Sequence, residues 1–263
     1  MRKLGINADL FEDRNALANL PLIRAAGFES TFVCYRDDAL TGKVAEAAAK
    51  QGLCLETLHA PFGHINDLWL PGEGGEGMLR ELTDCADACA RYGIPVMVVH
   101  ISSGIHAPHV NDLGHARFDR LVEHAGKVGV TIAFENQRKL ANIAFLFELY
   151  ADCAHVGFCW DCGHEKCFAG GREYMPLFGG KTVALHVHDN CCRDGCDDHL
   201  LPFDGGINYS RFAEHLRRNR FAGTLMLETM PEHNHRYDDL SHEAFFALAY
   251  ERAARLRTLV DSE

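Results

Sequence analysis

The feature that most constrains the fold of this chain is a regular alternation of short apolar runs with longer amphipathic segments. Short apolar runs are typical of buried strands, and strands that alternate with helical segments predict βα units and a parallel sheet. We expect eight such strands, and eight βα units most simply close into a (β/α)8 TIM barrel. The expected strands are Leu4–Ala8, Ser30–Tyr35, Leu53–His59, Pro95–Ile101, Val130–Asn136, Val156–Asp161, Thr182–His188 and Thr224–Thr229.

The segments between these strands carry helix start and stop signals. Residues 113–128 repeat their apolar side chains at helical spacing, and Asn111 is suited to cap the first turn. A last helix is expected near residues 241–259, whereas the glycine-rich stretch 71–77 predicts a mobile loop after the third strand. A glycine that can close a helix stands before each of the second to fifth strands: Gly27, Gly52, Gly93 and Gly129.

The length and the composition fit one α/β domain that spans residues 1–263. A single barrel of this type typically takes ~250 residues, and no linker or low-complexity tract divides the 263 residues. The formal net charge of −11 reflects 37 acidic against 26 basic residues. Because a duplex-DNA binder neutralises phosphates with clustered Lys and Arg, this balance argues against nucleic acid as a partner and favours a small molecule.

The cysteines and the N-terminus bear on the compartment. The 11 cysteines lie mostly inside apolar runs of a chain too long for a disulfide scaffold, which favours reduced thiols and a cytoplasmic location. No long apolar segment follows the N-terminus, so we expect neither a signal peptide nor a membrane span.

In this fold the catalytic residues collect at the C-terminal ends of the strands, and there the sequence places metal-ligand side chains. Glu135, Asp161, His186 and Glu228 each follow an apolar run on a different unit, so a closed barrel would bring them to one ring. Each carboxylate alone could simply cap the following helix. Converging buried carboxylates are unfavourable without a cation, however, and three carboxylates with one imidazole suit Mn²⁺, Mg²⁺, Co²⁺ or Zn²⁺.

The stretch around the seventh strand adds further candidates. Alternate strand side chains share a face, so His186 and His188 point the same way, and Asp197, Asp198 and His199 follow in the next loop. A solvated polar loop is the simpler interpretation of that segment. The pair Cys159-x-x-Cys162 has zinc or redox spacing, but it lies across a strand end without a second pair, so we interpret both thiols as packing residues.

Taken together, these motifs resemble the xylose-isomerase-like barrels. That family includes sugar phosphate isomerases and epimerases, ketose 3-epimerases, hydroxypyruvate isomerase and inosose dehydratase, and the type IV apurinic endonuclease is a relative. The resemblance covers nearly the whole chain. The motifs that carry it, in the family's order, are His59-Ala60-Pro61-Phe62, Phe134-Glu135-Asn136, Asp161-x-x-His164, His186-x-x-Asp189, Asp198-His199, Asp204-Gly205-Gly206-Ile207 and Leu227-Glu228-Thr229.

The resemblance implies a metal-dependent isomerase or epimerase of a small ketose or ketose phosphate, an enzyme of carbohydrate metabolism. Glu135 and Glu228 would be metal ligands with Asp161 and His186, and would also move a proton next to the carbonyl through a cis-enediolate. The residues implied to contact the substrate are His59, His164, His188 and Trp160, with a buried core position as the alternative for Trp160.

The endonuclease relative supplies an alternative function, a multinuclear zinc phosphodiesterase. The acidic charge and the lack of basic loops argue against that activity. A non-catalytic metal- or sugar-binding barrel is a third alternative, because a fold alone does not prove chemistry. The oligomeric state stays open, a homo-oligomer being one alternative. The residues that a second metal ion would use are His59, His100, His164, Asp197 and His199.

Overall fold

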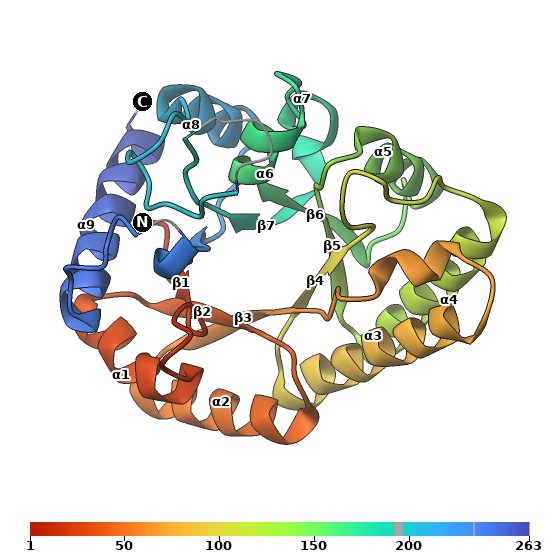
Figure 1. Cartoon of the computed structure of the whole chain (residues 1–263), viewed down its shortest axis with the longest axis horizontal. Helices are drawn as coiled ribbons and strands as arrows, with labels where there is room; N and C mark the ends of the chain where they lie inside the picture. Colours follow the sequence, from red (N-terminus) through yellow and green to blue (C-terminus); the bar gives the residue numbers. More distant parts are fainter. Residues whose placement is uncertain (192–196, 234, 263) are drawn as a thin grey trace.

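A parallel barrel forms the centre of the molecule (Figure 1). The computed structural model describes residues 1–191, 197–233 and 235–262. The hydrogen-bonded strand order is β7-β6-β5-β4-β3-β2-β1-β8, and a parallel bridge between Val187 and Leu227 joins the two ends. The strands are β1 (Leu4–Asn7), β2 (Ser30–Cys34), β3 (Cys54–His59), β4 (Val96–His100), β5 (Thr131–Glu135), β6 (Val156–Asp161), β7 (Thr182–His186) and β8 (Leu225–Leu227).

Helices surround this barrel as an outer ring (Figure 1). Short 3₁₀ helices add η1 (Ile65–Trp69), η2 (Gly179–Lys181) and η3 (Pro231–His233) to the connections. The α-helices are α1 (Ala16–Ala26), α2 (Asp38–Gln51), α3 (Glu73–Tyr92), α4 (Asp112–Val128), α5 (Leu140–Leu149), α6 (Cys162–Phe168), α7 (Met175–Phe178), α8 (Tyr209–Arg218) and α9 (His242–Asp261).

The structure confirms the single (β/α)8 barrel and all eight expected strands, with ends that shift by at most two residues. The side chain of Asn111 accepts a hydrogen bond from the amide of Gly114 and so caps α4. Left-handed glycines close the first four long helices, because a residue without a Cβ adopts positive φ freely. These are Gly27, Gly52, Gly93 and Gly129, with φ angles of 109°, 69°, 68° and 78°.

The prediction of a mobile loop at residues 71–77 is wrong, because α3 already begins at Glu73. The reason is a tertiary contact that the local composition does not contain. The buried guanidinium of Arg117, from α4, donates hydrogen bonds to the carbonyls of Asp67, Leu68 and Leu70 just before this helix. A Cβ on Gly75 would lie 2.2 Å from that guanidinium, so the glycine allows the close approach of α3 and α4.

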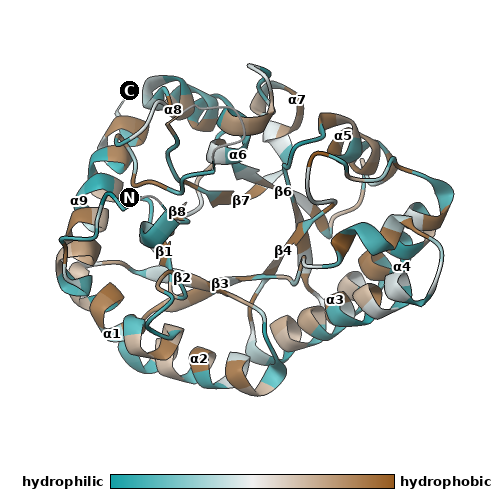
Figure 2. Cartoon of the chain, in the orientation of Figure 1, coloured by the Kyte–Doolittle hydropathy of each residue, from teal (hydrophilic) through white to brown (hydrophobic). Residues whose placement is uncertain are grey.

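Two apolar regions hold the barrel together. The large one lies between the strands and the helices, and apolar residues alternate with hydrophilic ones along the longer helices (Figure 2). A small one fills the barrel itself and consists of Val98, Ala133, Cys159 and Ala184. Cys159 is therefore a packing residue, as expected, and burial raises its pKa to about 12.

The cysteines whose placement is described, nine in number, form no disulfides. Cys192 and Cys196, in the loop after β7, lie outside the described residues. Arg2, before β1, pairs with Asp261 at the end of α9. None of the helices in the described ranges is long and apolar enough to cross a lipid bilayer.

Candidate metal centre

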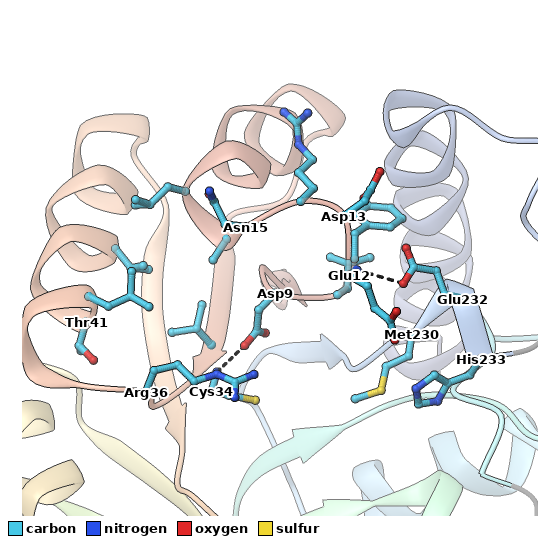
Figure 3. A pocket seen from close by; sticks show the side chains of 18 residues that line it. Asp9, Glu12, Asp13, Asn15, Cys34, Arg36, Thr41, Met230, Glu232 and His233 are labelled. Atoms are coloured by element: carbon cyan, nitrogen blue, oxygen red, sulfur yellow. Dashed lines mark hydrogen bonds between the residues drawn. The ribbon is translucent and has the colours of Figure 1, made fainter.

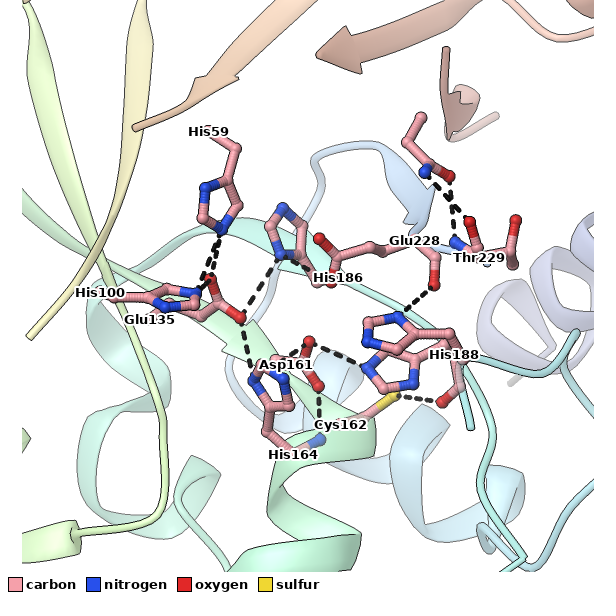
Figure 4. Close-up of polar contacts among 12 residues, drawn as sticks. His59, His100, Glu135, Asp161, Cys162, His164, His186, His188, Glu228 and Thr229 are labelled. Atoms are coloured by element: carbon pink, nitrogen blue, oxygen red, sulfur yellow. Dashed lines mark hydrogen bonds and ion pairs between the residues drawn. The ribbon is translucent and has the colours of Figure 1, made fainter. Parts of the chain in front are cut away.

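The four strand-end residues expected to bind a metal lie together at the C-terminal end of the barrel (Figure 4). Glu135, Asp161 and His186 end β5, β6 and β7, and Glu228 follows β8. One potential ligand atom from each residue lies within 4.8 Å of the others. The closed barrel produces this cluster, because it places the ends of four strands that are distant in sequence around one point.

Asp161 serves the fold and the centre at once. One carboxylate oxygen accepts a hydrogen bond from the amide of His164, 2.6 Å away, and so caps α6, which is the role a strand-end carboxylate can have without any metal. The other oxygen lies 3.1 Å from Nε2 of His188. Asn136 fixes the backbone of Asp161 through two 2.8 Å hydrogen bonds, which tie the end of β5 to the end of β6.

Glu135 is the most connected residue of the centre. Its Oε2 lies 3.3 Å from Nε2 of His59 and 3.1 Å from Nε2 of His100, at the ends of β3 and β4. Its Oε1 lies 3.0 Å from Nδ1 of His164 and 3.6 Å from Nδ1 of His186. A second group of candidate ligands, His59, Glu135 and His186, therefore shares this carboxylate with the first.

A third group lies beside the first and consists of His164, His188, Asp197 and His199. Oδ2 of Asp197 lies 3.3 Å from Nε2 of His164 and 3.6 Å from Nε2 of His199. The ring of His188 stacks on that of His199 with centroids 3.9 Å apart. All five residues expected at a second metal therefore lie at this end of the barrel. His59 belongs to the second group, and His164, Asp197 and His199 belong to the third. His100 is in neither group but contacts Glu135.

A neighbouring carboxylate shapes the loop that carries the third group. Asp189 is fully buried, and its oxygens accept hydrogen bonds from the amides of Asn190, Phe203 and Ile207. A Cβ on Gly205 would lie 2.4 Å from the carbonyl oxygen of Asn190, so only glycine allows this close turn. Asp189 therefore positions the loop and is not part of the ligand groups.

Unsatisfied polar atoms support a cation at this centre. Oδ1 of Asp197 is buried without a hydrogen-bond partner among the described residues. Oε2 of Glu135 and Nδ1 of His186 are also buried; Nε2 of His100 and Oε2 of Glu228 lie 3.1 and 3.2 Å from them, but these contacts lack hydrogen-bond geometry. Leaving a buried polar atom unpaired is unfavourable by about 1–3 kcal/mol, more if it is charged. A divalent cation would satisfy several of these atoms together, and imidazole and carboxylate are ligands it accepts. The residues present fit the metal that the sequence predicts.

The electrostatics of the centre agree with that fit. Burial raises the pKa of the Glu135 carboxyl, but the imidazoles of His100 and His186 outweigh this effect and hold the pKa well below its usual range. Burial lowers the pKa of His164, but Asp161 and Asp197 outweigh it and raise the pKa well above its usual value. The Glu135 carboxylate thus stays ionised and attracts positive charge, whether protons on the imidazoles or a metal cation.

A cavity of about 570 Å³ opens above the centre. Its lining includes both candidate proton-transfer residues, Glu135 and Glu228, together with His59 and His164, which were expected to contact substrate. His188 was also expected there, but the structure buries it completely beneath His199, against Asp161. It does not line the cavity and belongs with the ligand groups.

Trp160 does not reach the cavity either. It precedes Asp161 in β6, and neighbouring strand residues point to opposite faces, so its side chain turns toward the helices. Its ring stacks on Phe212 of α8 with centroids 4.8 Å apart, and Nε1 donates a hydrogen bond to Glu165. The expected substrate contact is therefore wrong, and the alternative of a buried core indole holds.

Gln137, which no motif predicted as a site residue, lies in the middle of the centre. Its Nε2 is 3.0 Å from Nε2 of His100 and 3.1 Å from Nδ1 of His164, and its side chain lines the cavity. Its place two residues after Glu135 was the available signal, because both follow the same strand. Arg36 and Asp9, in the loops after β2 and β1, also line the cavity and carry no motif.

A closed parallel barrel whose strands end in convergent carboxylates and imidazoles defines the class of this protein, a (β/α)8 barrel with a candidate metal centre. Within that class, the chain belongs to the xylose isomerase-like TIM barrel family, whose sequence profile matches residues 21–246. The match covers most of the chain and confirms the resemblance predicted from the motifs.

Individual relatives are more distant. The uncharacterized protein y4fM of Sinorhizobium fredii is 32% identical over 152 residues, which is 55% of this chain and 47% of that protein. The chain spans less than two thirds of the length of the curated relatives that it matches. The similarity to y4fM therefore indicates a common origin and says nothing about the activity of this chain.

Solved structures match over almost the whole chain. The D-psicose 3-epimerase of Clostridium cellulolyticum H10, solved with D-tagatose, has a TM-score of 0.79 at 13% identity, and the match covers 99% of this chain and 100% of that one. A xylose isomerase domain protein from Planctomyces limnophilus has a TM-score of 0.78 at 16% identity, with 98% of each chain covered. At such identities the similarity shows the fold.

Proposed function

We propose that this protein is a divalent-metal-dependent isomerase or epimerase of a small ketose or ketose phosphate. The observation that carries the proposal is the pair of carboxylates on either side of His186. Oε1 of Glu135 lies 3.6 Å and Oε2 of Glu228 lies 3.2 Å from Nδ1 of that histidine. Two carboxylates that flank one position are what a transfer with two bases requires, since one removes a proton and the other returns it.

The four residues of the first group would hold the metal: Glu135, Asp161, His186 and Glu228. When bound, a divalent cation polarises the carbonyl of the sugar and lowers the free energy of the charge that develops on its oxygen. The chain supplies the proton transfer. Neighbouring imidazoles keep the pKa values of Glu135 and Glu228 below their usual range despite burial, so both are carboxylates that can accept a proton.

The product depends on where the proton returns. If the second glutamate delivers it to the same carbon from the opposite face, the result is an epimer; if delivery is to the neighbouring carbon, a ketose becomes an aldose. The side chains of His164 and Gln137 line the cavity beside these carboxylates and are suited to contact the substrate hydroxyls. The fold shared with a D-psicose 3-epimerase supports this class of substrate.

Incorporation of solvent deuterium tests the proposal directly. Chelator-treated protein, reloaded with Mn²⁺, Co²⁺, Mg²⁺ or Zn²⁺, is incubated in D₂O with ketoses, ketose phosphates, hydroxypyruvate and inososes, and exchange next to the carbonyl is followed by NMR. We expect metal-dependent exchange that Glu135→Gln and Glu228→Gln each lower by about 10²–10⁴-fold. Glu46→Gln, on the exposed surface of α2, is the matched control. Exchange that survives both site substitutions would contradict the assigned roles.

The second and third ligand groups favour one other function, a multinuclear metal phosphodiesterase. Its ligands would include His59, His164, Asp197 and His199 in addition to the first group. Two or three tightly bound ions per chain, with nicking of an abasic duplex at physiological salt, would support this alternative. The net charge of −11 argues against a nucleic acid substrate.

A further inference from the structure

A second cavity adjoins the candidate metal centre. It has a volume of about 610 Å³ and lies between the loop after β1, the start of α2 and η3 (Figure 3). Five residues line both this cavity and the one above the metal centre, so the two cavities meet at a common border. These border residues are Asp9, Cys34, Arg36, Met230 and His233.

The two cavities together offer more room than a single sugar needs. Pockets that enclose a whole drug-sized ligand measure about 300–1,000 Å³, and each of these cavities reaches that range alone. A monosaccharide that reacts between Glu135 and Glu228 is accommodated above the metal centre. The second cavity is then free for another part of the same molecule.

Fixed hydrogen-bond acceptors face this second cavity. Oδ2 of Asp9 accepts a hydrogen bond from the amide of Cys34 at 2.8 Å, and Oε2 of Glu232 accepts one from the amide of Glu12 at 3.0 Å (Figure 3). These amides hold both carboxylates in place at the wall of the cavity, and the thiol of Cys34 also contacts Asp9. Carboxylate oxygens held in this way bind hydroxyl groups through short, charge-assisted hydrogen bonds.

The charge of the lining distinguishes between classes of ligand. Besides one histidine, the lining of the second cavity carries four carboxylates and two guanidiniums. This excess of negative charge repels a phosphate or a carboxylate group on a ligand. The ring of Phe11 adds an apolar surface, which packing against Phe245 and Phe246 holds in place. Acceptors beside an aromatic ring suit a neutral unit with many hydroxyls and apolar C–H faces.

We propose that the second cavity is a subsite for a neutral, hydroxyl-rich unit joined to the reacting sugar. The substrate is then a ketose that carries a second sugar or polyol, and not a free monosaccharide. The identity of the reacting unit rests on the proposed function. The subsite itself rests on the shared border, the volume and the acceptors of the second cavity.

Binding measurements test the subsite without requiring turnover. The probes are D-fructose and three disaccharides that join glucose to fructose through different linkages: isomaltulose, turanose and leucrose. Dissociation constants come from calorimetry on the metal-loaded protein, and saturation-transfer NMR reports whether the glucose unit contacts the protein. We expect at least one disaccharide to bind tenfold or more tightly than fructose, with contacts to its glucose unit. If all four sugars bind equally, the subsite does not exist.

Two variants locate the gain in affinity. Ala16→Trp places a large ring in the second cavity from the start of α1, and we expect it to abolish the disaccharide advantage while fructose binding stays unchanged. Ala39→Trp, exposed at the start of α2 and outside the lining, is the matched control. Glu12→Ala, a smaller change in the same lining, should weaken disaccharide binding by about fivefold. Full affinity in Ala16→Trp and Glu12→Ala would overturn the proposal.

Deuterium exchange separates the subsite from the proposed function. Disaccharide binding without exchange in any sugar leaves the subsite in place and refutes the isomerase chemistry. Exchange with equal kcat/KM for fructose and the disaccharides supports the chemistry and refutes the subsite.

Discussion

Replacing Glu135 by glutamine tests the candidate metal centre most directly. This carboxylate belongs to two of the three ligand groups and lies within 3.6 Å of four imidazole nitrogens. Glutamine keeps the shape of the side chain and removes its charge. The substitution should therefore weaken metal binding to the first and second groups together, while the third group, centred on Asp197, keeps its ligands.

The size of the effect follows from linkage between binding and folding. A metal at about 100 times its dissociation constant stabilises the folded chain by about 2.7 kcal/mol. In a protein of 150–250 residues, a stabilisation of this size raises Tm by about 5–11 °C. This chain is slightly longer, so the rise should not exceed that range. We expect a rise of this order when chelator-treated wild-type protein is titrated with Mn²⁺ or Zn²⁺, and at most a small fraction of it in Glu135→Gln.

Differential scanning fluorimetry measures this response, and the comparison is made within each variant, with and without metal. That design cancels the change in stability that the substitution causes in the metal-free protein, where the imidazoles lose their counter-charge. Asp197→Asn is the matched control, because it alters the third group and leaves the first intact. A full metal-induced rise in Glu135→Gln would refute the ligand assignment, and a wild-type Tm indifferent to chelator and metal would refute the centre itself.

Three further predictions concern the framework of the site. Trp160→Phe should lower the free energy of unfolding by about 1–3 kcal/mol in urea titrations, because the hydrogen bond to Glu165 and part of the packing are lost; a changed KM would contradict the outward position of this ring. Glu173→Gln should lower the free energy of unfolding by less than about 1 kcal/mol at neutral pH. The effect is small because the ion pair of Glu173 with Arg211 is partly exposed to solvent. The hydrogen bond to Arg211 lowers the pKa of Glu173 from 4.5 to about 2. The stabilisation by this carboxylate is therefore present above pH 4.5 and lost as the pH falls through 2. If Glu173→Gln lowered the free energy of unfolding equally at pH 4.5 and pH 2, the pairing would be refuted. Gly205→Ala should destabilise the chain by about 1–3 kcal/mol, because its Cβ would meet a carbonyl oxygen at 2.4 Å, and unchanged unfolding in urea would show that the turn relaxes.

The sequence by itself determined the barrel and the four strand-end ligands. Buried strands are apolar runs, helix ends carry their own glycines, and both signals are local, so the strand ends could be predicted to within two residues. That precision was enough to place Glu135, Asp161 and His186 at or beside the ends of their strands. Their convergence needed only the rule that parallel strands of a barrel end at one face. The outward position of Trp160 was also available from the alternation of side chains, one residue before Asp161.

Tertiary structure alone decided the rest. The stretch 71–77 became helical because Arg117, 45 residues away, contacts its start at the carbonyl of Gly72, and no local pattern contains that contact. Glu135 meets four imidazoles and His188 lies buried beneath His199 because side chains from separate strands and loops compete for the same small volume at the barrel end. The second cavity has the same origin, since the space between three loops depends on how they pack and not on the composition of any one of them.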